Sequence, residues 1–156
     1  MSILTSTYGL SVGDLIKAKV RAYNERGWGL QSIANSVGIL AQTVPQAVAL
    51  PTTDDSITGE TQVFVQWAEL TTNTEIGGSA ITSYHLQTDK ATTQLNGSPT
   101  WSDVKGGGPE SLTTSETLTS DITAGYTYRF RVRASNLHGW GEYSAIASIK
   151  AAQIPY

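Results

Sequence analysis

The sequence of 156 residues contains no cysteine, so neither a disulfide nor a thiolate metal site can stabilise any part of it. It also has no apolar run approaching the roughly 20 residues that span a bilayer. The first residues lack the basic and apolar regions of a signal peptide, which leaves the localisation open. The formal net charge of −3 disfavours a nucleic-acid partner. We therefore expect a chain with no membrane span and no nucleic-acid partner.

Residues with catalytic or metal-binding chemistry are few. The two histidines, His85 and His138, have no acidic neighbours at metal-ligand spacing, and we expect both on the surface. Neither a Gly-x-Ser-x-Gly elbow nor a phosphate-binding glycine loop is present. The scattered acidic residues fit no calcium loop and are expected in solvated turns: Asp54, Asp55, Asp89, Asp103 and Asp121. The sequence therefore predicts no catalytic residue, no metal site, no cofactor and no enzyme activity.

One segment of the sequence occurs twice. Residues 13–29 return as residues 125–141, displaced by 112 positions (125 minus 13), and both copies end in Asn-x-x-Gly-Trp-Gly. A repeat at a fixed offset indicates a tandem array of one structural unit. Because Pro45 and Pro155 follow the two copies at matching points, we place an incomplete unit at residues 1–45 and a complete unit at residues 46–156.

Strand signals dominate both units. Apolar and polar residues alternate in runs rich in β-branched side chains, with glycine, asparagine and proline between them. The pattern predicts an all-β fold, in which the complete unit is a seven-stranded two-sheet sandwich of the immunoglobulin-like type and the incomplete unit has two to three strands. Asn96-Gly97-Ser98 is expected to be a turn, although it also matches a glycosylation acceptor. The strands of the complete unit are expected at residues 47–57, 62–67, 81–88, 101–104, 111–119, 126–136 and 143–151.

The complete unit resembles a fibronectin type III domain. The resemblance rests on Ile122-Thr123-Ala124-Gly125-Tyr126-Thr127-Tyr128, on the Val-x-Ala-x-Asn that ends at Asn136, and on Trp67 and Tyr84 in earlier strands. It implies that Tyr128 is the corner tyrosine, whose hydroxyl bonds to backbone a few residues upstream. The expected core comprises Trp67, Tyr84, Leu86, Ile122, Tyr128, Phe130 and Val132.

The incomplete unit resembles only the last third of such a domain. Ile16 stands in the place of the corner tyrosine Tyr128, and Ala18 stands in the place of Phe130. Its apolar residues have no opposing sheet within residues 1–45. Burying them against a partner would stabilise the unit by several kcal/mol, at about 0.8 kcal/mol per methylene. We therefore expect a homodimer, formed either by two half-units that complete a sandwich or by strands added to the complete unit.

Basic residues occupy the outward positions of the repeated strand, and a Gly-Trp-Gly follows each set. The tryptophan can fold back over the basic groups in a cation–π ladder, which is similar in residue type to the Trp/Arg ladders of cytokine-receptor sandwiches. Alternatively, Trp140 is an exposed anchor that binds a ligand together with His138. The expected ladder residues are Arg129, Arg131, Arg133 and Trp140 in the second copy and Lys17, Lys19, Arg21 and Trp28 in the first.

These expectations favour a non-catalytic structural or protein-interaction module of a larger multi-repeat protein, acting as a spacer, adhesion or scaffold element. The alternative is a module that binds carbohydrate or protein at the rim around Trp140. A solvent-exposed Trp140 would favour the alternative, and a ring packed against the ladder would favour the first.

Overall fold

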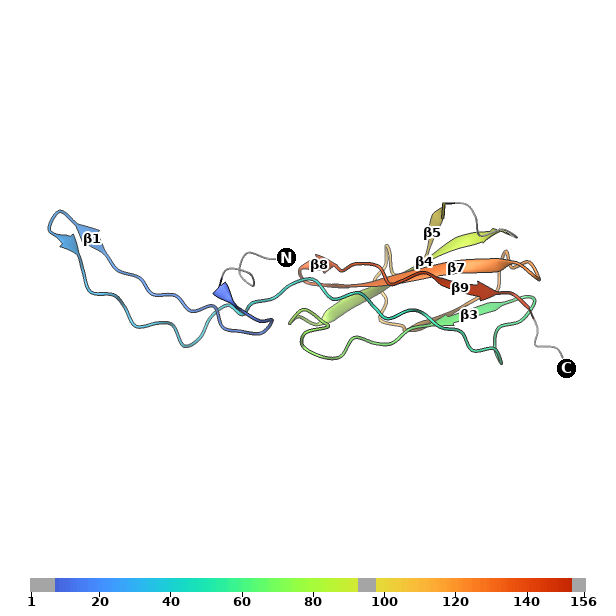
Figure 1. Ribbon diagram of the computed structural model, residues 1–156, viewed down its shortest axis with the longest axis horizontal. Helices are drawn as coiled ribbons and strands as arrows, with labels where there is room; N and C mark the ends of the chain where they lie inside the picture. Colours follow the sequence, from blue (N-terminus) through green and yellow to red (C-terminus); the bar gives the residue numbers. More distant parts are fainter. Residues whose placement is uncertain (1–7, 93–97, 153–156) are drawn as a thin grey trace.

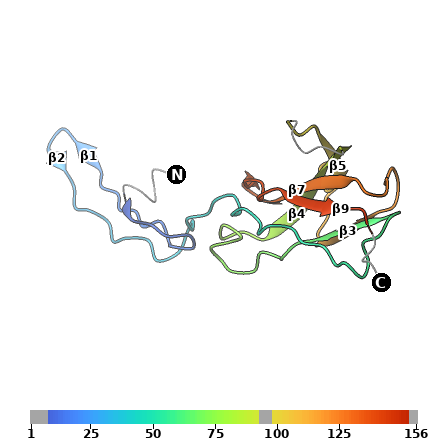
Figure 2. The same cartoon turned by 45° about the vertical axis from the view of Figure 1, so that its right-hand side comes forward.

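The computed structural model of the protein describes residues 8–92 and 98–152. It has two parts, which Figures 1 and 2 show end to end. A narrow two-stranded ribbon, residues 14–41, projects from one end of a β-sandwich, residues 46–152. The ribbon carries β1 (Tyr23–Asn24) and β2 (Gly27–Trp28) at its tip.

The sandwich consists of two antiparallel sheets. The smaller sheet pairs β3 (Val63–Gln66) with β6 (Ser115–Leu118). In the larger sheet the order is β5-β4-β7, and both β8 and β9 pair with β7 beyond it. Its strands are β4 (Ile81–Thr92), β5 (Trp101–Lys105), β7 (Thr127–Asn136), β8 (Gly139–Trp140) and β9 (Ala147–Lys150). The all-β sandwich predicted from the sequence is confirmed.

The strand expected at residues 47–57 is wrong. This segment makes one isolated bridge, between Thr52 and Gln66, and forms no ladder in the described chain. Pairing beside β3 does not continue past Thr52 because a turn begins at Asp54, whose carbonyl oxygen accepts from Ile57 N–H and Thr58 N–H.

Alternation on β7 builds the core. Phe130, Val132 and Ala134 are fully buried, while the residues between them face outward and are half-buried. Trp67 also lies in the core, where its Nε1–H finds no partner among the described residues, at a cost of roughly 1–3 kcal/mol. The residues expected in the core lie there: Trp67, Tyr84, Leu86, Tyr128, Phe130 and Val132 are buried, and Ile122 packs against them partly exposed.

Tyr128 spans the corner before β7. Its hydroxyl donates to the carbonyl oxygen of Asp121 at 3.0 Å and accepts from the backbone N–H of Thr123 at 2.8 Å. Both bonds satisfy the polar end of a ring that is otherwise buried. This is the geometry that the corner motif implies.

The ribbon repeats the backbone pairing of the last hairpin of the sandwich. Gly29 N–H donates to Ala22 carbonyl at 2.8 Å, as Gly141 N–H donates to Ala134 carbonyl at 2.8 Å. Tyr23 pairs with Trp28 in the register in which Ser135 pairs with Trp140. The repeat in the sequence is therefore a repeat of one hairpin geometry.

A serine side chain fixes the same register in both hairpins. The hydroxyl of Ser32 accepts from Val20 N–H at 3.0 Å, and that of Ser144 accepts from Val132 N–H at 3.1 Å. Further along, the offset between the hairpins falls to 110 (151 minus 41), because the ribbon accommodates two extra residues in the bend at residues 36–38.

Burial distinguishes the two hairpins. Val132 is fully buried and Ile149 is 6% exposed, whereas the equivalent ribbon residues, Val20 and Ile39, are 72% and 77% exposed. Within the described residues, no sheet lies opposite the apolar face of the ribbon.

Candidate interaction surfaces

A stack of alternating aromatic and guanidinium groups covers the outer face of the larger sheet. The guanidinium carbon of Arg131 lies 4.2 Å from the ring centroid of Trp101 and 3.8 Å from that of Tyr143. Arg133 lies 4.5 Å from Tyr143 and 4.8 Å from Trp140. We call these five residues the ladder: Trp101, Arg131, Tyr143, Arg133 and Trp140.

The ladder differs in its order from the sequence expectation. Trp140 stacks with Arg133, but Arg131 stacks with Trp101 and Tyr143 instead. Arg129 lies outside the stack, and its Nε donates to the buried carboxylate of Asp89 at 2.7 Å. The expectation that Asp89 is a solvated turn residue is therefore wrong.

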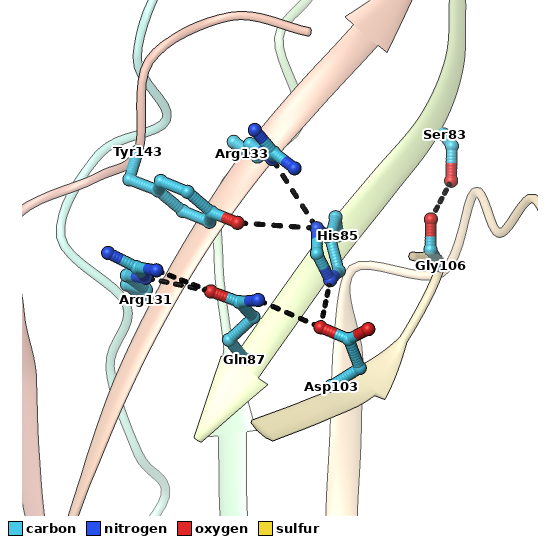
Figure 3. Close-up of polar contacts among 8 residues, drawn as sticks. All are labelled: Ser83, His85, Gln87, Asp103, Gly106, Arg131, Arg133 and Tyr143. Carbon is cyan, nitrogen blue, oxygen red and sulfur yellow. Dashed lines mark hydrogen bonds and ion pairs between the residues drawn. The ribbon is translucent and has the colours of Figure 1, made fainter. Parts of the chain in front are cut away.

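Polar side chains of β4 and β5 hold the ladder in place (Figure 3). Arg131 donates from Nε and Nη2 to the amide oxygen of Gln87, at 2.9 and 2.7 Å. The amide nitrogen of Gln87 in turn donates to Asp103 at 2.8 Å. Fixing the guanidinium plane in this way leaves both of its faces free to stack.

His85 sits at the centre of this network and is 4% exposed, so the expectation of a surface histidine is wrong. Its Nε2 lies 2.8 Å from the carboxylate of Asp103, and its Nδ1 lies 3.4 Å from Arg133 Nε (Figure 3). Because Arg133 can only donate, Nδ1 is the acceptor in that contact and Nε2–H is the donor to Asp103. The rings of Trp140 and Tyr143 cover the imidazole, at centroid distances of 5.5 and 6.1 Å.

The pKa of the Asp103 carboxyl is lowered from its ordinary value of 3.8. The hydrogen bond from Gln87 is the main cause, and the bond with His85 comes second. Both bonds favour the ionised form, so the carboxylate is a stable acceptor at neutral pH.

The first copy holds a shortened version of the ladder. Arg21 lies 4.3 Å from the ring of Trp28, and Tyr23 packs beside the same ring at 4.9 Å. Lys17 and Lys19 are exposed and stack on no aromatic ring within the described part of the chain. The position equivalent to Tyr143 is Gln31, and the ribbon has no strand equivalent to β5, so both aromatic groups that flank Arg131 are missing.

Trp101 and Tyr143 belong to the ladder although the sequence did not predict them there. Trp101 reaches the ladder because β5 pairs with β4, which pairs with β7. Tyr143 reaches it because the chain after Gly141 runs beside β7, where Ser144 N–H donates to Val132 carbonyl. The one local sequence signal for Tyr143 was its position, two residues after the end of Gly-Trp-Gly.

The junction between ribbon and sandwich, residues 41–46, is hydrogen-bonded to two turns of the sandwich. Thr43 N–H donates to Gly77 carbonyl at 2.9 Å, and Gln46 N–H donates to Glu75 carbonyl at 2.8 Å. Gly77 has a φ of +69°, and a Cβ there would lie 2.2 Å from the carbonyl oxygen of Thr43. This close approach requires glycine.

The turn between β7 and β8 contacts the other side of the junction. The buried amide of Asn136 donates to the carbonyl oxygens of Thr43 and Ile76, each at 2.8 Å. His138, which was expected at a ligand rim, is exposed and its Nε2 lies 3.0 Å from the amide oxygen of Gln42. His138 is therefore part of the junction.

A cavity of about 380 Å³ lies beside the loop after Leu70, next to the hydroxyl-bearing end of Tyr84. Glu69 is the one carboxyl in its lining, and the Tyr84 hydroxyl accepts a hydrogen bond from Leu70 N–H at 2.9 Å. Its other lining residues are Leu70, Thr71, Ile76, Ala80, Ile81, Tyr84 and Leu112.

Residues 8–92 and 98–152 contain no group of three or more side chains arranged to hold a metal ion. Over the same ranges, no helix has the length and apolar character needed to cross a membrane. The possible acceptor Asn96 lies outside the described residues.

Two antiparallel sheets packed face to face, with a tyrosine corner, define an immunoglobulin-like β-sandwich module. The model of the family described as "Fibronectin type III domain" matches residues 51–150. The chain therefore belongs to the fibronectin type III family, as the resemblance implied.

Solved structures of the same fold are similar to this chain. Domains A168–A170 from titin share 23% identity at a TM-score of 0.54, covering 83% of this chain and 38% of that one. The sixth fibronectin type III domain from human fibronectin type III domain containing protein 3 shares 19% identity at a TM-score of 0.54, covering 78% and 96%. This chain thus spans little more than a third of the titin segment, and comparison with curated protein sequences gave no match.

Proposed function

We propose that the protein is a non-catalytic structural and protein-interaction module of a larger multi-repeat protein, in which it acts as a spacer or scaffold element. The observation that carries this proposal is the junction, where residues 42–46 are bonded to two separate turns of the sandwich. Titin, the source of one similar structure, is a multidomain protein, and domains of this fold are generally non-catalytic.

The junction supports a spacer because it restrains the angle between consecutive units. Thr43 is held on two sides, through its N–H by Gly77 and through its carbonyl by Asn136. Each such bond contributes about 0.5–1.5 kcal/mol, so several together make reorientation costly. An array with restrained angles keeps its length and presents its surfaces at fixed spacing.

The proposal includes a homodimer through the apolar face of the ribbon. Val20 and Ile39 are 72% and 77% exposed on the face whose equivalent is the core of the sandwich, and Val37, in the bend at residues 36–38, is 80% exposed. Two such faces can bury one another around a two-fold axis. Replacement of the last hairpin of a second sandwich is disfavoured, because Ala18 would stand where Phe130 fills the core.

Binding of a ligand at a rim around Trp140 is not part of the proposal. One face of the indole is occupied by Arg133, and its ring also packs against His85. His138 is engaged by Gln42. These contacts favour a structural role for Trp140.

The experiment compares Asn136→Ala with the matched variant Asn24→Ala. Each residue accepts a backbone N–H in the turn of its own hairpin, Asn24 from Arg26 and Asn136 from His138. Asn136 also donates to the carbonyl oxygen of Thr43 in the junction. By ¹⁵N relaxation, we expect the ribbon and the sandwich to tumble as one body in the unsubstituted chain and in Asn24→Ala, and to separate in Asn136→Ala. Independent tumbling in the unsubstituted chain would refute the spacer, and a monomer at about 100 μM in sedimentation velocity would refute the homodimer.

A further inference from the structure

The free edge of the ribbon is the surface that the fold leaves open. Backbone groups of Asp14, Ile16, Ala18, Val20 and Ala22 bond the opposite strand of the ribbon. The residues between them, Lys17, Lys19 and Arg21, make no backbone hydrogen bond within the described chain, and all three are exposed. Alternate residues thus present unpaired N–H and C=O groups along one edge.

The same edge is occupied in the sandwich. Lys17, Lys19 and Arg21 correspond to Arg129, Arg131 and Arg133 at the offset of 112. The latter pair across the sheet with Asp89, Gln87 and His85 of β4, which supply an acceptor for each guanidinium. The sandwich therefore shows what kind of strand covers this edge.

We propose that the edge formed by residues 15–23 binds an extended, acidic segment of a partner polypeptide by strand addition. The segment lies antiparallel, with carboxylates at alternate positions opposite Lys17, Lys19 and Arg21 and apolar side chains between them. Opposite charges directly across a pair of strands are attractive, and the three basic residues repeat that preference at alternate positions along the edge. The proposal extends the interaction role proposed above to one surface and one chemistry of partner.

The edge of a second chain is a poor partner for this edge in strand pairing. Antiparallel pairing of two ribbons about Lys19 would place Lys19 opposite Lys19 and Lys17 opposite Arg21. Like charges directly opposite destabilise a sheet. The homodimer proposed above uses the apolar face instead and leaves the edge available.

The probe is a synthetic peptide with the sequence of residues 81–89 and the changes His85→Glu and Gln87→Glu, so that its three outward residues are acidic. Titrated into the full ¹⁵N-labelled chain, it should shift and protect the amides of Lys17, Lys19 and Arg21. Affinity should fall as salt rises from about 50 to about 500 mM. A matched peptide with His85→Lys, Gln87→Lys and Asp89→Lys should bind at least about tenfold more weakly.

Two chain variants with equal charge change locate the site. Lys19→Glu should weaken binding of the acidic peptide at least about tenfold, and Arg26→Glu, at the tip, should change it less than about twofold. Equal binding of the two peptides, absence of binding, or shifts confined to Val37 and Ile39 would overturn the proposal. Protection of Lys19 by dimer formation alone would also overturn it. None of these outcomes alters the tumbling that tests the spacer.

Discussion

The two copies of one hairpin differ in their surroundings far more than in their backbone. Residues 14–41 and 126–151 share the turn, the serine that bonds across the strands and the arginine stacked on tryptophan. Yet Val132 has lost all contact with solvent and Val20 is 72% exposed. Local sequence is therefore sufficient for the hairpin geometry, and burial depends on strands supplied from elsewhere.

The consequence is that the same substitution should have different effects in the two copies. In the sandwich, each side chain of β7 is held by β4 and by the opposing sheet. In the ribbon, the equivalent side chains contact solvent. Matched substitutions at equivalent positions measure what the opposing sheet contributes.

Phe130→Ala should have the largest effect. The ring is fully buried, so its removal should lower the free energy of unfolding by about 3–5 kcal/mol. The reciprocal change, Ala18→Phe, gives the ribbon the residue of the sandwich. At protein concentrations low enough to keep the chain monomeric, it should change the free energy of unfolding by less than about 0.5 kcal/mol. Denaturant unfolding monitored by fluorescence checks both. A strong stabilisation by Ala18→Phe would show that the ribbon already has a covered face.

Arg131→Lys, which gives the ladder the residue found at Lys19, should have an intermediate effect on the free energy of unfolding. The guanidinium stacks between Trp101 and Tyr143 and donates two bonds to Gln87, which an ammonium group cannot reproduce. We expect a loss of about 1–2 kcal/mol in the free energy of unfolding. Lys19→Arg should be neutral, since the ribbon has neither flanking ring. Equal effects at the two positions would contradict a structural role for the ladder.

Local patterns in the sequence predicted what local structure determines. Alternation indicated the strands, and the corner motif placed Tyr128, whose hydroxyl bonds the backbone at Asp121 and Thr123. The Gly-Trp-Gly ending predicted that Trp140 would fold onto an arginine, and the structure has it on Arg133. Each of these features involves residues within one hairpin or corner.

Features made by distant segments could not be predicted in this way. Trp101 joins the ladder through the pairing of β5 with β4, and His85 is buried because Tyr143 and Trp140 cover it. The alternation of apolar and polar residues within one strand does not indicate which ring from another segment will lie over a given histidine. The junction through Asn136 likewise depends on turns brought together by the complete fold.

Asp103 offers the smallest test, and it concerns a strand that the ribbon lacks. Hydrogen bonds from Gln87 and His85 lower the pKa of its carboxyl below 3.8, so its contribution to stability is present above about pH 4 and is lost as pH falls through the lowered value. Between about pH 5 and pH 2, Asp103→Asn should therefore lose stability less steeply than the unsubstituted chain. Asp14→Asn, in the ribbon, should leave the acid dependence of the sandwich unchanged. The measurement is the denaturant midpoint of unfolding as a function of pH across this range. If the midpoints of Asp103→Asn and of the unsubstituted chain fall in parallel, the hydrogen bonds from Gln87 and His85 to the carboxylate do not form in solution.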